Sequence, residues 1–181
     1  MELFEQLSSQ IKGQGKTLVF PEGEDVRIQG AAIRLAAEEL VKPILLGNKS
    51  EIEATAAANN FDLSGVQIVD PAEYPADARE KMVDALVERR NGKTDAATAS
   101  QWLEDVNYFG TMLVYLGVAD GMVSGATHPT GDTVRPALQI IKTAPGSSRI
   151  SGAFVMQRDD ERYIFADAAI NIDIDAQTMA E

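Results

Sequence analysis

Short apolar runs and amphipathic stretches alternate along the first 143 residues of the chain. Over residues 2–13 the apolar side chains recur with a helical period, which predicts an amphipathic helix. An apolar run at 18–20 follows and is closed by Pro21 and Gly23. Such a run with such an ending is typical of a buried strand and its exit loop.

The same alternation continues and predicts a parallel sheet. Further strands are expected at 42–46, 66–70 and 119–125, and further helices near 26–40, 49–59, 76–90, 95–103, 105–117 and 133–143. The strands are short and apolar on both faces, as in sheets that helices cover on each side. The pattern therefore predicts a doubly wound α/β fold with a mostly parallel sheet.

The pattern changes after Pro145. Two apolar runs flank the charged segment "RDDER" at 158–162, which predicts an antiparallel hairpin with a charged turn. A final helix is expected to begin behind Asp175 as its cap. The small and turn-forming residues of "APGSS" (144–148) mark a candidate boundary. We therefore expect a first, incomplete α/β domain over 1–145 and the beginning of a second domain over 146–181.

Composition and charge exclude several classes of function. The chain of 181 residues is 45% hydrophobic and has no cysteine, so it can bury a core but forms no disulfide or thiolate metal site. We see no signal peptide and no apolar run of about 18 residues, and we expect a cytoplasmic protein without a membrane span. The net charge of −12 argues against nucleic acid. An anionic small molecule would need a local basic site.

The stretch 123–143 has the composition of an anion-binding loop at a helix entrance. Asp132 or Thr133 is expected to cap the helix, which would place Pro136 in its first turn. A helix N-terminus at the carboxyl edge of a parallel sheet attracts phosphate. The candidate contacts are hydroxyls, flexible glycines and one guanidinium: Ser124, Gly125, Thr127, Thr130, Gly131, Thr133 and Arg135. A polar loop with a well-capped helix is the alternative interpretation.

Four further groups have competing interpretations. His128 precedes a proline, and we favour a loop histidine without a chemical role over a catalytic base. The acidic residues of "FPEGED" could hold a metal or act as a base, but helix capping is the favoured interpretation; they are Glu22, Glu24 and Asp25.

A basic segment ends the predicted helix 76–90 and contains Arg89, Arg90 and Lys93. These cations either suit the helix dipole or contact a phosphate near Arg135. Asp167 and Asn171, after the hairpin, either face a cleft or are simply polar residues at a strand end.

Three segments together resemble the phosphate acetyltransferase (phosphotransacetylase) family. They are "LVFPEGEDVR" (18–27), "DGMVSGATHPTGDTVRPALQIIKT" (120–143) and "FADAAIN" (165–171), in order and with fitting spacing. The resemblance implies reversible acetyl transfer between coenzyme A and inorganic phosphate, which yields acetyl phosphate. It also implies two α/β domains around a cleft, similar to isocitrate and isopropylmalate dehydrogenases, a dimer, and neither a metal nor a nicotinamide cofactor.

The resemblance also assigns roles to residues. It implies that Arg135 and Arg89, with Arg90 as a neighbouring possibility, contact coenzyme A, and that 124–133 borders the cleft where the acyl phosphate sits. The substrate-binding residues implied are Ser124, Gly125, Thr130, Thr133, Arg135, Arg89 and Arg90. Pro129 and Gly131 differ from many relatives, and Ala168 stands where some carry a cysteine, consistent with direct transfer to the coenzyme A thiolate.

Members of the family are considerably longer than 181 residues, and their Ser-Arg pair and acidic base belong to a later segment. We therefore expect no catalytic residue in this chain, which resembles the N-terminal part of such an enzyme and would be inactive alone. A phosphate butyryltransferase-like enzyme and a non-catalytic module that binds coenzyme A or phosphate are the alternatives. A metal-dependent decarboxylating dehydrogenase would need clustered carboxylates and a cofactor site, and neither is evident.

Overall fold

The computed structural model describes residues 3–172 and 174–180. The chain divides into two compact units, Met1–Ile141 and Lys142–Glu181, and each is described by itself. The boundary predicted after residue 145 lies close to this division. That the second unit begins a further domain stays a prediction.

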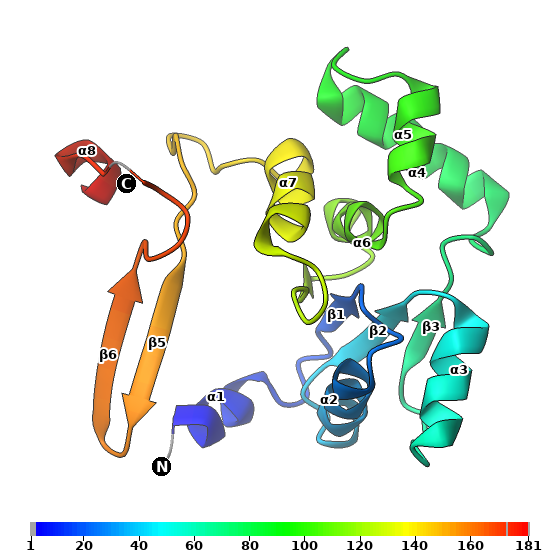
Figure 1. The fold of residues 1–181 in the computed structure, drawn as a ribbon, viewed down its shortest axis with the longest axis horizontal. Coiled ribbons are helices and arrows are strands. Elements are labelled where there is room, and N and C mark those ends of the chain that lie inside the picture. Colours follow the sequence, from blue (N-terminus) through cyan, green and yellow to red (C-terminus); the bar gives the residue numbers. More distant parts are fainter. Residues whose placement is uncertain (1–2, 173, 181) are drawn as a thin grey trace. The chain divides into compact units, whose positions relative to one another are not determined.

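The first unit is built on a parallel sheet. Its strands are β1 (Thr17–Phe20), β2 (Lys42–Leu46), β3 (Gln67–Val69) and β4 (Gly121–Met122), in the order β3-β2-β1-β4 (Figure 1). All three neighbouring pairs are parallel. Since β1 pairs with both β2 and β4, the loops that leave these three strands emerge side by side at one edge of the sheet.

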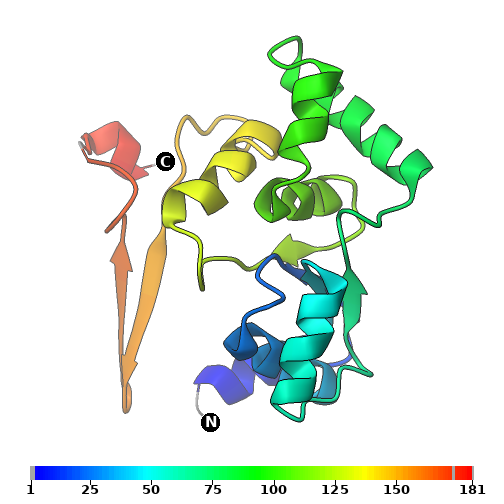
Figure 2. The same ribbon diagram turned by 45° about the vertical axis from the view of Figure 1, so that its right-hand side comes forward.

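Seven helices accompany this sheet in the described part of the first unit. They are α1 (Leu3–Ile11), α2 (Val26–Ala37), α3 (Lys49–Ala58), α4 (Ala76–Arg90), α5 (Ala96–Trp102), α6 (Val106–Tyr115) and α7 (Thr130–Ile140). Figures 1 and 2 show α2 and α3 on one side of the sheet and α4 and α6 on the other. The predicted cover of helices on both faces is confirmed.

Strand alternation produces two separate cores. Successive side chains of a strand point to opposite faces. Val19 and Leu46 therefore join the core that α4, α5, α6 and α7 cover, which includes the fully buried Phe109. Phe20 and Leu45 join the smaller core under α2 and α3. The apolar runs of β1 and β2 are continuous because each of these strands contributes side chains to both cores.

The second unit contains the predicted hairpin. β5 (Ala153–Arg158) and β6 (Glu161–Ala166) pair antiparallel, and the turn between them places Asp159 at φ 53°. Every residue of both strands is exposed in this unit. The predicted cap of the last helix is also confirmed, because the Asp175 carboxylate accepts a hydrogen bond from the Thr178 N–H (2.8 Å) at the start of α8 (Ala176–Ala180).

The predicted start of α7 was wrong. The helix begins at Thr130 behind Pro129, and neither Asp132 nor Thr133 is its cap. The Asp132 N–H already bonds the Pro129 carbonyl (3.0 Å), so the first turn closes before Thr133. Pro136 consequently lies inside the helix, where it is buried and removes one main-chain hydrogen bond. Arg135 stands in the second turn rather than at the helix entrance.

Within the described residues, no helix combines the length and the apolar composition needed to cross a membrane.

Candidate active site

The loops that follow β1 and β4 meet on the carboxylate of Glu22. The N–H groups of Gly125 and Ala126 donate to its Oε2 at 3.0 and 2.7 Å. Those of Thr127 and His128 donate to its Oε1 at 2.6 and 2.8 Å. Four consecutive main-chain N–H groups thus converge on one carboxylate, the arrangement that proteins use to bind anions.

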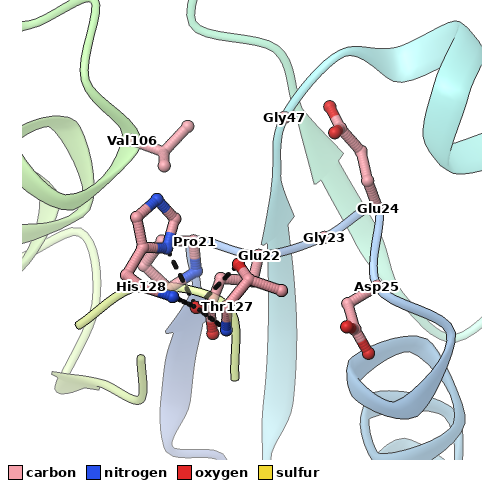
Figure 3. Close-up of a pocket in the computed structure, with 9 residues that line it drawn as sticks. All are labelled: Pro21, Glu22, Gly23, Glu24, Asp25, Gly47, Val106, Thr127 and His128. Atoms are coloured by element: carbon pink, nitrogen blue, oxygen red, sulfur yellow. Dashed lines mark hydrogen bonds and ion pairs between the residues drawn. The ribbon is translucent and has the colours of Figure 1, made fainter. Parts of the chain in front are cut away.

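Two side chains complete the shell around Glu22. The Thr127 hydroxyl donates to Oε1 (3.1 Å), and Nδ1 of His128 lies 2.9 Å from the same oxygen (Figure 3). The Glu22 side chain is only 2% exposed. Burial alone would raise its pKa, but hydrogen bonds from Thr127, Ala126 and His128 outweigh burial and lower the pKa to about 2. Glu22 is therefore a buried anion at neutral pH.

This arrangement changes what the loop after β4 can offer a ligand. The sequence marks 124–133 as a segment that donates hydrogen bonds to an anion, and the structure places such an anion there from the chain itself. The N–H of Gly125 is thus engaged by Glu22. Gly125 has φ +118°, a conformation that side-chain-bearing residues rarely adopt, and this conformation turns the loop around the carboxylate.

The two other acidic residues of the β1–α2 loop have structural partners. Asp25 caps α2 by accepting from the Arg27 N–H (2.8 Å) and also binds the Arg27 guanidinium (2.7 Å), so the favoured capping interpretation is confirmed for Asp25. Arg27 in turn donates to the Ala126 carbonyl (3.0 Å). Glu24 accepts from the Asn48 N–H (2.9 Å). Across residues 3–172 and 174–180, no group of three or more acidic, His or Cys side chains is placed to hold a metal.

Ser124 and Thr133 belong to a chain of hydrogen bonds that links the loop after β4, α7 and α6. The Thr133 hydroxyl donates to the Ser124 hydroxyl (3.1 Å), which donates to Oδ1 of Asn107 (2.7 Å). Asn107 is fully buried, and its Nδ2 has no hydrogen-bond partner. Thr130, the first residue of α7, is exposed. The sequence does not single out Asn107, because a lone asparagine in an apolar helix carries no motif.

Arg89 and Arg90 bind the C-terminal end of α7. Arg89 donates to the carbonyls of Ile140 (2.5 Å) and Ile141 (2.7 Å), and Arg90 donates to that of Gln139 (3.3 Å). A helix C-terminus carries partial negative charge and unpaired carbonyls, which cations stabilise. The sequence predicts a stabilising role at the end of their own helix, α4, whereas the structure places them on a neighbouring one.

Arg135 differs from these two arginines. It is exposed on α7, and no described side chain or carbonyl forms a hydrogen bond or ion pair with it. Burial raises the pKa of Tyr108, while the charges of Arg135 and Arg90 act in the opposite direction. Both arginines therefore lie close enough to one tyrosine to influence its ionisation, and a phosphate site shared by them stays a prediction.

A cavity of about 480 Å³ opens at the carboxyl edge of the sheet (Figure 3). It is lined by residues from the loops after β1, β2 and β4 and from the start of α6: Pro21, Glu22, Gly23, Glu24, Asp25, Gly47, Val106, Thr127 and His128. Ligands of open α/β sheets bind at this edge. Among these lining residues are three carboxylates and no arginine or lysine.

In the second unit, Asp167 and Asn171 bind each other. Nδ2 of Asn171 donates to both carboxylate oxygens of Asp167 (2.8 and 2.9 Å) and to the Ile150 carbonyl (3.0 Å). This closed set favours the interpretation as polar residues that organise a strand end.

Comparison with known proteins identifies the family. A model of the phosphate acetyl/butaryl transferase family matches residues 2–181. The chain belongs to this family. It is 51% identical over 180 residues to the phosphate acetyltransferases of Staphylococcus epidermidis and Bacillus subtilis, covering 99% of this chain but 54% and 55% of theirs. The chain thus spans about half the length of the curated relatives it matches.

Solved structures agree with this assignment. A EutD phosphotransacetylase from Staphylococcus aureus superposes with a TM-score of 0.91 at 50% identity, over 98% of this chain and 53% of the other. A phosphotransacetylase from Streptococcus pyogenes gives 0.92 at 49% identity, over 99% and 56%. The family resemblance of the three sequence segments is confirmed, as is an α/β fold with a parallel sheet.

Proposed function

We propose that this chain forms one wall of the active site of a phosphate acetyltransferase. The reaction is the reversible transfer of an acetyl group between coenzyme A and phosphate. The coenzyme A thiolate forms a C–S bond to the acetyl carbon of acetyl phosphate, and the C–O bond to phosphate breaks. The observation that carries this proposal is the 51% identity to phosphate acetyltransferases across 99% of the chain.

Arg135 is the residue we assign most directly to substrate. An exposed guanidinium without an internal partner remains available to a phosphate group, which it can bind with two parallel hydrogen bonds. Arg90, which also acts on Tyr108, would add charge to the same face. Arg89 donates hydrogen bonds to carbonyls at the end of α7, so its contribution to substrate binding would be mainly electrostatic. Ser124, Thr130 and Thr133 would border the acyl phosphate, and Gly125 would shape the loop that carries them.

Several finer features belong to the same proposal. Coenzyme A is a substrate, and we propose no resident cofactor or metal and no catalytic residue among those of this chain. The family resemblance also supports a doubly wound arrangement like that of isocitrate and isopropylmalate dehydrogenases, a homodimer and a cytoplasmic location. Light scattering on the purified full-length enzyme measures the dimer directly.

We prefer a phosphate acetyltransferase over the two alternatives, a phosphate butyryltransferase-like enzyme and a non-catalytic module. The matched family includes butyryl transferases, but the similar curated proteins are acetyltransferases. A non-catalytic coenzyme A module differs from an enzyme in turnover rather than in binding. The proposal places the Ser-Arg pair and the acidic base outside these 181 residues, so we expect this chain to bind coenzyme A without forming acetyl-CoA from acetyl phosphate.

Calorimetric titration with coenzyme A tests the proposal. Arg135→Ala is expected to weaken binding about tenfold, the loss of a charge-assisted contact. Arg34→Ala is the matched control, because Arg34 is also an exposed helical arginine, with only a long 3.8 Å contact to Glu38. Equal affinities of the two variants would refute the role of Arg135. Rapid turnover by the 181-residue chain would refute the absence of catalytic residues.

A further inference from the structure

The contact between Glu22 and His128 fixes which ring nitrogen carries the proton. An ionised carboxylate only accepts hydrogen bonds, so the 2.9 Å contact from Nδ1 to Oε1 requires a proton on Nδ1. In the neutral imidazole, Nε2 then carries a lone pair and can only accept. Glu22 thus determines the hydrogen-bonding character of the opposite side of the ring.

The geometry leaves that opposite side free to meet a ligand. Figure 3 shows one ring nitrogen of His128 directed at Glu22 and the other pointing away from it. Nε2 forms no hydrogen bond with any described residue, and the ring lines the 480 Å³ cavity with its side chain 29% exposed. The His128 N–H also donates to Glu22 (2.8 Å), so both the main chain and the ring are held by one carboxylate.

The charge of the cavity restricts what can occupy it. Glu22, Glu24 and Asp25 all line it, and Arg27, in the first turn of α2, is bound to Asp25. A doubly charged phosphate would lie among like charges here, which is unfavourable in a partly buried site. A neutral group that donates a hydrogen bond to Nε2 meets no such penalty. Of the proposed substrates, the thiol end of coenzyme A is neutral and carries such a proton.

We propose that this cavity receives the thiol end of coenzyme A, that His128 contacts it through Nε2, and that Glu22 is the positioning residue that fixes the ring. This inference rests on the proposed function and adds the orientation of the coenzyme. The thiol S–H donates to Nε2 at the carboxyl edge of the sheet, while the phosphates of coenzyme A extend toward Arg135 and Arg90. His128 is thus assigned a substrate contact, a role that its sequence context did not favour.

Nitrogen NMR of the imidazole tests this directly, because His128 is the only histidine of the chain. With ¹⁵N-histidine in the wild-type chain, we expect the neutral ring to carry its proton on Nδ1 and not on Nε2. Pantetheine, the neutral thiol portion of coenzyme A, should shift the Nε2 signal, and its S-methyl derivative should not. A proton on Nε2 in the neutral ring, or a shift with inorganic phosphate but none with pantetheine, would overturn the proposal.

Variants separate the positioning role from simple folding. Glu22→Gln presents an amide that both donates and accepts, so the ring should lose its single tautomer and pantetheine should bind about tenfold more weakly. Glu24→Gln removes the same charge from the same cavity but leaves the ring contact, and should keep the tautomer. If Glu22→Gln does not fold, His128→Gln retains Glu22 and its N–H donors. That variant should lose pantetheine binding, and full retention would contradict the contact.

The two proposals fail in different ways. Binding of coenzyme A that depends on Arg135, with no response of Nε2 to pantetheine, would overturn the orientation and leave the proposed function standing. A pantetheine response at Nε2 without any binding of coenzyme A would overturn the proposed function, while the cavity would remain a thiol site.

Discussion

The loop after β4, which surrounds Glu22, and the arginine cluster on α4 and α7 are both candidate anion sites in the sequence, yet the structure uses them differently. In the loop, four N–H groups, a hydroxyl and an imidazole all converge on a carboxylate from the same chain. In the cluster, Arg89 and Arg90 are engaged by main-chain carbonyls of α7, and Arg135 alone is left exposed.

The difference shows how a fold distributes its polar groups. Buried donors must find acceptors, and main-chain N–H groups cannot move to the surface, so a neighbouring loop supplies a carboxylate. Long arginine side chains can reach a helix end or solvent. In these two regions, Arg135 and Nε2 of His128 are accessible and form no hydrogen bond with any described residue, so both remain available to a ligand.

The largest expected effect comes from Glu22→Ala. This change leaves four consecutive N–H groups without their acceptor, and the free energy of unfolding should fall by about 4 kcal/mol. Urea denaturation followed by fluorescence of Trp102 measures this loss. Glu24→Ala, which removes the acceptor of one N–H, should cost about 1 kcal/mol. Equal urea midpoints for the two variants would show that Glu22 stabilises the fold no more than Glu24 does.

Lowering the pH tests the contribution of the Glu22 carboxylate to stability in a second way. The folded-state pKa of Glu22, about 2, lies below its ordinary value of 4.5, so folding disfavours the protonated form. The stabilisation is fully present above pH 4.5 and is lost as the pH falls toward 2. The wild-type chain should therefore lose more stability over this range than Glu22→Gln. Parallel pH curves of unfolding free energy would contradict the lowered pKa.

Arg89→Met tests the other region. The substitution keeps the aliphatic length but removes the donors to the carbonyls of Ile140 and Ile141, and should cost about 1–2 kcal/mol. Lys93→Met, in the same basic segment but exposed, is the control and should change stability by less than about 0.5 kcal/mol. A similar small effect for both would mean that Arg89 is not needed to hold α7.

Arg135→Ala should have the smallest effect on stability. Arg135 is exposed and has no internal partner, and alanine favours helix, so the unfolding free energy should change by less than about 0.5 kcal/mol. The same variant should still weaken coenzyme A binding. A loss of stability as large as that of Arg89→Met would place Arg135 in the structure of α7 rather than in a ligand site.

Most of the fold followed from local pattern. The period of apolar residues placed α4 at Ala76–Arg90 and the short strands of the sheet, because these elements must bury one face or both. The two apolar runs around a charged turn placed the hairpin of β5 and β6. The start of α7 was missed because Pro129, rather than a residue with a capping side chain, precedes it. Local propensity favoured Asp132 or Thr133 as the N-cap, but the first helical turn already begins at Pro129.

The candidate site was predictable in its location and not in its chemistry. Gly125 and the hydroxyls mark the loop after β4, and Pro21 and Gly23 mark the loop after β1. Nothing in either segment indicates that Glu22 would enter the other loop, since the two lie about a hundred residues apart and meet only through the pairing of β1 with β4. For the same reason His128 gave no sign of its carboxylate partner.

The sequence by itself determined the α/β class, the two-part organisation, the family and the negative net charge, because composition, periodicity and motif spacing are properties of the chain. The tertiary structure alone decided which polar groups satisfy one another. Parallel strands bring distant loops to one edge, and a buried carboxylate is stable only where enough N–H groups converge on it. Whether Glu22, His128 and Arg135 face the protein or a ligand is therefore set by strand order and helix packing.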